Sequence, residues 1–181
     1  GLGDVYKRQF RGRDALFFVV IMLMLLPFQV TMVPNVITLR AMGLLDTIWA
    51  IILPMTVAPF YIFLLRQYMV GLPGDMIEAA QIDGAGTLRC FIHVVLPVCQ
   101  PILGAAVALS FADCWNLVEQ PLTYLTTRTE LYPLSVVFNQ LTQQSTGVEF
   151  AGAALYTLPA LLIYLYFQND ILEGVQLTEL K

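Results

Sequence analysis

Between Leu16 and Phe28 the chain reads LFFVVIMLMLLPF, an unbroken apolar run. Near its other end, Leu158 to Phe167 reads LPALLIYLYF and is equally apolar. Neither run alternates apolar and polar residues, as the strands of a membrane β-barrel do. A hydrocarbon core of about 30 Å needs about 20 residues of helix, each rising 1.5 Å. The two runs therefore predict membrane-spanning helices.

The composition of the whole chain agrees with that prediction. Of the 181 residues, 58% are hydrophobic and only 12% are charged, and the mean hydropathy is +0.73. A soluble domain carries about 25% charged residues, because its water-facing surface needs them. Half of that charge cannot cover a soluble globule, so the sequence predicts an integral membrane protein. The net charge of −4 and the lack of a basic cluster argue against nucleic-acid binding.

Four apolar segments are long enough to cross a membrane. The expected spans cover about residues 15–34, 47–66, 95–114 and 150–169. The fold class that they predict is all-α, a polytopic bundle of transmembrane helices. The opening GLGDVYKRQ leads into no apolar span, so residues 1–9 are expected to be a non-native or disordered leader to a membrane domain covering 10–181.

The positive charges predict the orientation of the spans. Lys and Arg concentrate in cytoplasmic loops of membrane proteins. With the N-terminus inside, the cytoplasmic side holds Lys7, Arg8, Arg11, Arg13, Arg66, Arg89 and Lys181, against Arg40 and Arg128 outside. The sequence therefore favours a cytoplasmic N-terminus, a cytoplasmic loop between the second and third spans, and a cytoplasmic C-terminus.

The cysteines and the single histidine do not indicate chemistry. Cys90, Cys99 and Cys114 show no CxxC spacing and have no partner histidines, which argues against a disulfide framework and a zinc site. We expect them to be small buried hydrophobic residues. His93 has no second candidate ligand nearby and is expected to be an interfacial side chain. No catalytic residue, metal or cofactor is predicted.

The cytoplasmic loop, about residues 67–96, contains the most informative stretch. It reads LPGDMIEAAQIDGAG from Leu72 and reaches Leu96-Pro97 after a second helical pattern. Asp75 is a candidate N-cap for the helix MIEAAQID, and Gly84 is placed to end that helix. Ala79 and Ala80 are small, so another protein surface can approach the helix closely. A loop that only joins two spans has no need of such a helix, and we expect a partner to dock on it.

This stretch resembles the EAA loop of ABC importer permeases. The family pattern is EAA, three residues, Gly, nine residues, Ile, one residue, Leu-Pro. Here Glu78-Ala79-Ala80, Gly84 and Leu96-Pro97 stand at that spacing, with Val94 in place of Ile. The longer form EAAQIDGAG resembles the carbohydrate-importer branch, the maltose-type second permease subunit. The resemblance covers nearly the whole chain after residue 9.

The resemblance implies a fold and a set of partners. The fold is the type I permease bundle, of which four of an expected six spans are present, so we expect this chain to be a fragment. The partners are a dimer of ABC ATPase subunits, which hydrolyse the ATP, a second permease subunit, an extracytoplasmic solute-binding protein and the lipid bilayer of the inner or plasma membrane. The implied ATPase-coupling residues are Glu78, Ala79, Ala80, Asp83, Gly84, Ala85, Leu96 and Pro97.

A substrate path is predicted less firmly, from polar residues in and beside the spans. The candidates are Gln29, Gln100, Asp113, Trp115 and Asn116. Sugars are bound through hydrogen bonds to their hydroxyls and through aromatic faces, and such side chains supply both. The alternative interpretation is that the same residues make hydrogen bonds between helices and anchor the interface.

Two other functions stay open at this stage. An intramembrane enzyme would need a nucleophile, base or metal cluster within reach, and the spans offer one histidine and no facing pair of charges. A secondary transporter generally shows internal repeats, and the EAA loop is not repeated in this sequence. The sequence favours a sugar or oligosaccharide importer, without excluding a polyol or glycerol phosphate as the solute.

Overall fold

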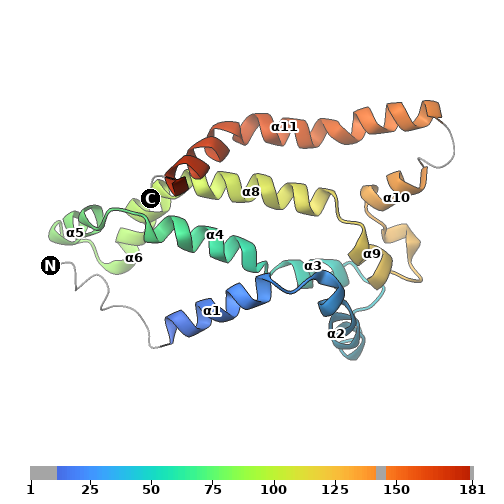
Figure 1. Cartoon of the computed structure of the whole chain (residues 1–181), viewed down its shortest axis with the longest axis horizontal. Helices are drawn as coiled ribbons and strands as arrows, with labels where there is room; N and C mark the ends of the chain where they lie inside the picture. Colours follow the sequence, from blue (N-terminus) through green and yellow to red (C-terminus); the bar gives the residue numbers. More distant parts are fainter. Residues whose placement is uncertain (1–11, 142–145, 180–181) are drawn as a thin grey trace. The chain divides into compact units, whose positions relative to one another are not determined.

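The computed structural model describes residues 12–141 and 146–179, and every regular element in those ranges is a helix. The predicted leader, residues 1–9, lies outside them. The helices in Figure 1 are α1 Arg13–Met24, α2 Phe28–Ala41, α3 Trp49–Met55, α4 Pro59–Val70, α5 Gly74–Ile82, α6 Thr87–Cys90, α7 Leu96–Val98, α8 Gln100–Trp115, α9 Glu119–Tyr124, α10 Leu134–Leu141 and α11 Thr146–Glu179. A π-helical turn, η2 (Phe91–Val95), links α6 to α7, and a 3-10 turn, η3 (Thr129–Leu131), precedes α10.

Within the described residues, two helical segments alone are long and apolar enough to cross a membrane. They are Trp49–Val70 and Glu149–Gly174. Two further segments meet the same criteria if a bent pair of helices counts as one span: α1 with α2, and the run 87–98 with α8. By length and composition, up to four candidate spans therefore lie in this part of the chain, and each overlaps one of the predicted segments.

Prolines interrupt the helices of these spans, which are therefore less regular than the sequence predicts. The first apolar run is not one helix over 15–34, because α1 ends at Met24 and α2 begins after Pro27. Pro27 is itself extended (ψ 151°), and the residue before it avoids helical geometry because a proline follows. The second span is interrupted before Pro59, and α4 continues to Val70, beyond the predicted end of that span at residue 66.

The chain divides into two compact units. Unit 1 contains residues 59–108 with the described residues before 24 and after 166, and unit 2 contains residues 24–58 and 109–166. The core of unit 1 is built on Tyr68, Cys99 and Ile102. The core of unit 2 is built on Leu39, Ala50 and Tyr124.

Most large apolar side chains lie outside these cores. In the most apolar 18 residues of Trp49–Val70 and of Glu149–Gly174, only 6% and 0% of the residues are buried. Residues such as Phe150, Leu155 and Leu162 are more than 60% exposed. Apolar surface on this scale is typical of helices whose outer faces meet lipid or other membrane helices.

Candidate functional site

Helix α5 carries the EAA residues and begins two residues earlier than predicted. Pro73, in extended geometry, precedes the helix and Gly74 opens it. Asp75 is therefore in the first turn and is not the N-cap, and no side chain caps this end. A carboxylate in the first turn still favours the helix, because it faces the positive end of the helix dipole.

The end of α5 is fixed by Gly84, as predicted. Gly84 has a φ of +80°, a conformation in which side chains other than glycine's are strained. Its N–H donates to the carbonyl of Gln81 (3.0 Å), and the N–H of Ala85 donates to the carbonyl of Ala80 (2.9 Å). These two bonds form a Schellman motif, which satisfies the last carbonyls and stops the helix sharply.

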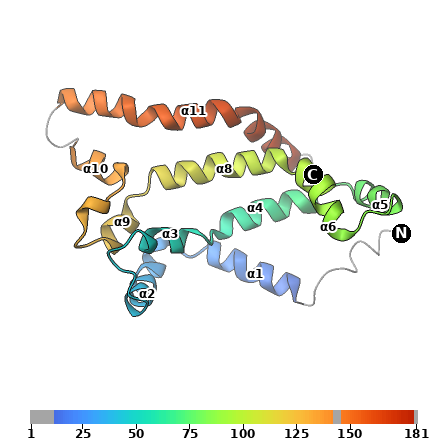
Figure 2. The ribbon, with the colours of Figure 1, turned by 180° about the vertical axis from the view of Figure 1, so that it is seen from behind.

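One face of α5 lies against the chain that follows it. Met76 and Ile77 line a small pocket of about 10 Å³ together with Val94 and Val95 of the π-helical turn, and Met76 is 39% exposed. Figures 1 and 2, seen from opposite sides, both place α5 beside α6. Helix α5, α6 and the π-helical turn therefore form one packed body, which we call the coupling body.

The rest of α5 is open to a partner. Ile82 is 86% exposed, Ala79 and Asp83 are exposed, and Glu78, Ala80 and Ala85 are partly buried. From residue 67 to residue 88 the chain carries Asp75, Glu78 and Asp83 and no Lys or Arg. The structure therefore places six of the predicted coupling residues in one small, acidic surface, beside the highly exposed side chain of Ile82.

Leu96 and Pro97, the last two predicted coupling residues, lie on the other side of the π-helical turn. Leu96 begins α7, and both residues are exposed. Pro97 lies in the first turn of α7, and the helical run from Thr87 continues through it to Val98. Helix α8 begins at Gln100, after a break at Cys99.

The candidate path residues do not form one cluster. Gln100 belongs to unit 1 and Asp113 to unit 2, and their thirteen-residue separation on α8 corresponds to about 20 Å of helix. Gln29 is exposed in the first turn of α2. Gln100 instead lines a polar cleft of about 500 Å³ in unit 1, together with Tyr68, Asp170 and Glu173.

Trp115 and Asn116 make contacts between helices. The indole Nε1–H of Trp115 donates to the carbonyl of Tyr156 on α11 (3.1 Å), and the Tyr156 hydroxyl donates to the carbonyl of Trp115 (2.7 Å). The rings of Phe111 and Tyr156 lie 5.5 and 5.3 Å from the indole. The amide of Asn116 donates to the Ala112 carbonyl (2.9 Å). In this arrangement Trp115 joins α8 to α11, which is the alternative interpretation that the sequence left open.

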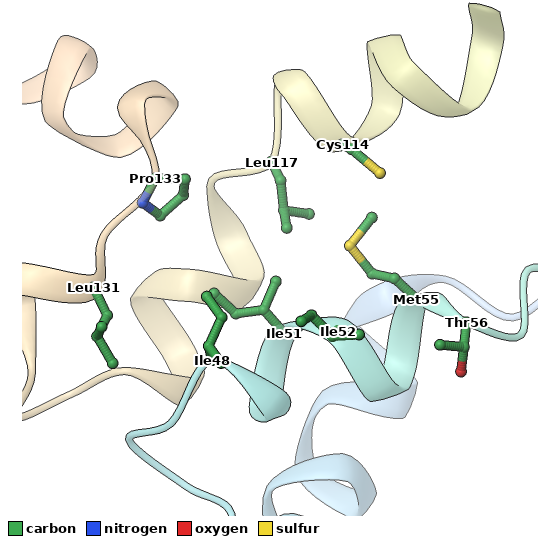
Figure 3. Close-up of a pocket in the computed structure, with 9 residues that line it drawn as sticks. All are labelled: Ile48, Ile51, Ile52, Met55, Thr56, Cys114, Leu117, Leu131 and Pro133. Atoms are coloured by element: carbon green, nitrogen blue, oxygen red, sulfur yellow. The ribbon is translucent and has the colours of Figure 1, made fainter. Parts of the chain in front are cut away.

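An apolar pocket of about 450 Å³ lies nearby in unit 2 (Figure 3). Its lining residues come from α3, the end of α8 and the loop before α10: Ile48, Ile51, Ile52, Met55, Thr56, Cys114, Leu117, Leu131 and Pro133. The side-chain hydroxyl of Thr56 donates to the Leu53 carbonyl (2.7 Å), so it is not directed to a ligand. Such a lining does not match a solute rich in hydroxyl groups. Cys114 is exposed here, which corrects the expectation that all three cysteines are buried, whereas Cys90 and Cys99 are buried as expected.

Several residues that organise the site escaped the sequence analysis. Tyr68, in α4, donates its hydroxyl proton to the carbonyl of Val98 (3.0 Å). Asp170, in α11, packs its carboxylate over Gly104 so closely that a Cβ at position 104 would collide with it. The partners in these pairs lie 30 and 66 residues apart in the sequence, and neither pair shows a spacing that predicts the contact. For Gly104 the one available signal was its place in a run of small residues, which indicates close helix packing without naming the partner.

Comparison with known proteins decides the family. The model of the binding-protein-dependent transport system inner membrane component matches residues 2–171. The chain belongs to this family. The resemblance that the EAA loop and its spacing indicated is thereby confirmed, and so is a membrane location.

Curated relatives in this family include sugar permeases. The chain is 29% identical over 175 residues to the arabinooligosaccharides transport system permease protein of Bacillus subtilis, covering 95% of this chain and 62% of the relative. It is 32% identical to the diacetylchitobiose uptake system permease protein of Streptomyces coelicolor, over 92% of this chain and 57% of the relative. The chain thus spans about three fifths of the length of these relatives.

A solved structure shows the same fold. The chain matches a bacterial ABC transporter involved in the import of the acidic polysaccharide alginate, with a TM-score of 0.66 and 25% identity. The match covers 96% of this chain and 64% of the solved chain. The all-helical fold of an ABC importer permease, predicted from the sequence, is confirmed.

Proposed function

We propose that the chain is part of the membrane-spanning permease subunit of an ATP-driven importer, and that α5 is the helix on which the cytoplasmic ATPase docks. The observation that carries this proposal is the surface of α5. That surface has the small side chains of Ala79 and Ala80, is acidic, exposes Ile82, and lies on the coupling body. An amphipathic helix that only rests on lipid headgroups would instead carry Lys and Arg on its polar face.

The same proposal assigns the partners. A dimer of ATPase subunits would supply the energy, a second permease subunit would complete the path, and an extracytoplasmic binding protein would deliver the solute. The family description names binding-protein-dependent transport, and the solved relative is an ABC transporter. ATP can drive such a permease only if it binds more favourably to one conformation than to another, so the coupling surface has to move with the ATPase.

We propose a sugar or an oligosaccharide as the solute. The relatives are described as permeases for arabinooligosaccharides, lactose and diacetylchitobiose, although one is described as a permease for sn-glycerol-3-phosphate. Gln29, Gln100, Asp113, Trp115 and Asn116 remain candidate path residues. Asp113 and Asn116 are exposed at the end of α8 and carry the hydrogen-bonding groups that a sugar requires.

Co-purification tests the docking proposal. The chain is co-expressed with its candidate ATPase and second permease, extracted in detergent and captured through a tag on the membrane protein. The parent is expected to retain the ATPase. Glu78→Lys and Ile82→Ser are expected to weaken ATPase binding by about fivefold or more, which corresponds to the loss of one well-packed interface contact of about 1 kcal/mol.

Gln67→Lys is the matched control for Glu78→Lys. Gln67 is also exposed, but it lies on α4, outside the acidic surface of α5. This variant is therefore expected to retain the ATPase. Equal retention of the ATPase by the parent and both α5 variants would contradict docking through α5.

A further inference from the structure

Two prolines weaken the helical hydrogen bonding between the coupling body and α8, although Cys99 and Leu103 still donate to the carbonyls four residues earlier. Phe91–Val95 is a π-helical turn, which carries one residue more than an α-helical turn and is often found at functional sites. Pro97 follows it after Leu96. A proline has no N–H, and its ring displaces the carbonyl four residues earlier, here that of His93. The wider π-helical turn gives that ring room.

A break follows two residues later. At Cys99 the backbone leaves helical geometry (ψ 1°), and the helical run 87–98 makes an angle of 67° with α8. Pro101 then removes a second N–H, the one that would pair with the carbonyl of Pro97. The carbonyl of Val98, beside the break, accepts the hydroxyl proton of Tyr68 at 3.0 Å.

The two sides of this segment differ in the space beside them. On the side of α5, Val94 and Val95 line a small pocket of about 10 Å³. On the other side lies the cleft of about 500 Å³, lined in part by Pro97, Gln100 and Pro101. Side chains can move into an open cleft more easily than against neighbouring atoms. Space for a bending motion is therefore present on the cleft side.

We propose that residues 96–101 form a joint, through which the coupling body swings toward the cleft relative to α8 while the Tyr68 hydroxyl holds the pivot at Val98. This inference rests on the proposed docking of the ATPase on α5. It adds the place where that movement is passed to the membrane-spanning helices. The missing backbone N–H groups of Pro97 and Pro101 lower the resistance to bending there, and the contacts of α5 with α6 and the π-helical turn hold the moving body together.

A fixed bend would look the same in one structure, so the test measures movement. Spin labels are attached at Leu88→Cys on α6 of the coupling body and Val107→Cys on α8, both exposed, with the native cysteines replaced by alanine. The distance between the labels is measured in the assembled importer with and without ATP. We expect the distance to change with ATP in the parent.

Restoring the N–H group at position 101 should stiffen the joint. The variant Pro101→Ala is expected to retain the ATPase, because Pro101 is not one of the predicted coupling residues and the α5 surface is untouched. It should lose the ATP-dependent change in distance and reduce transport per ATP hydrolysed by about fivefold or more, which is the lower end of ordinary coupling energies. Pro34→Ala, which removes a proline inside α2, is the matched control and should keep both.

Tyr68→Phe tests the pivot without changing a proline. It keeps the ring among its neighbours and removes the bond to the Val98 carbonyl, so we expect a broader distribution of distances with the ATPase still bound. An unchanged distance in the ATPase-bound parent, or a parent-like distance change in Pro101→Ala, overturns the joint alone. Failure of the parent to bind the ATPase overturns the proposed function, and the joint with it.

Discussion

Two glycines near the end of α5 allow the effect of backbone geometry to be measured apart from the effect of steric space. Gly84 has a φ of +80° and Gly86 a φ of −68°, and neither has an atom within 4 Å of the position that a Cβ would take. Gly84→Ala should therefore cost about 1–2 kcal/mol through backbone strain alone. Part of that cost is expected to appear as weaker ATPase binding, by about fivefold for each 1 kcal/mol. Titration of the detergent-solubilised chain with the ATPase measures it.

Gly86→Ala supplies the comparison, because alanine adopts its extended geometry freely. It should bind the ATPase like the parent. If both alanine variants bind equally well, the Schellman end of α5 has no part in docking, whatever the rest of the helix does.

Asp46 makes a second residue-scale prediction, outside the membrane-spanning segments. Its carboxylate accepts the N–H of Thr127 (2.8 Å), and its own N–H donates to the carbonyl of Tyr124 (3.0 Å). The Thr127 hydrogen bond lowers the pKa of Asp46 below its usual value of 3.8. A lowered pKa stabilises the folded loop above about pH 4, and this contribution is lost as the pH falls through the folded-state pKa.

The measurement is hydrogen exchange at the Thr127 amide. Protection is expected to fall on acidification below about pH 4 in the parent. Position 46 has a φ of 58°, which asparagine tolerates as aspartate does. Asp46→Asn also keeps a hydrogen-bond acceptor but removes the group that titrates. In this variant the protection of the Thr127 amide should therefore not change with pH in that range. Glu130 titrates nearby with a pKa lowered by the side chain of Arg128, and Glu130→Gln separates the two carboxyls. A pH dependence that survives Asp46→Asn would contradict this assignment.

At the scale of elements, the sequence predicted where the helices lie better than whether each helix runs unbroken. The four apolar segments and the helix at Glu78–Ala80 lie where composition and the 3.6-residue period place them. The breaks at Pro27 and before Pro59 follow from proline chemistry, which the sequence shows. Other prolines, such as Pro34 and Pro159, lie inside α2 and α11. Local sequence does not distinguish these cases, because neighbouring helices decide whether the freed backbone groups find partners.

The contacts between elements were beyond prediction from one sequence. The reciprocal hydrogen bonds of Trp115 and Tyr156 join residues 41 positions apart. Trp115 attracted attention as an aromatic next to Asp113 and Asn116, and that pattern is compatible with both sugar binding and helix packing. The indole N–H and ring contacts are what favour packing for Trp115 in this structure.

At the scale of the whole molecule, orientation is the property on which docking depends. An ATPase can reach α5 only if the loop between the second and third spans is cytoplasmic, and the distribution of Lys and Arg favours that side. Two exposed positions test it: Gly86 in this loop and Thr126 in the loop between α9 and η3. In a cysteine-free chain, a membrane-impermeant maleimide added to intact cells should label Thr126→Cys and not Gly86→Cys.

Inverted membrane vesicles should give the opposite pattern, because they expose the cytoplasmic side. Detergent-solubilised protein, in which both positions should react, controls for buried thiols. Labelling of Gly86→Cys in intact cells would place α5 outside the cytoplasm. In that orientation no cytoplasmic ATPase could bind α5, so loss of co-purification in Glu78→Lys would have to arise from misfolding. The topology measurement therefore decides how the binding experiments are interpreted.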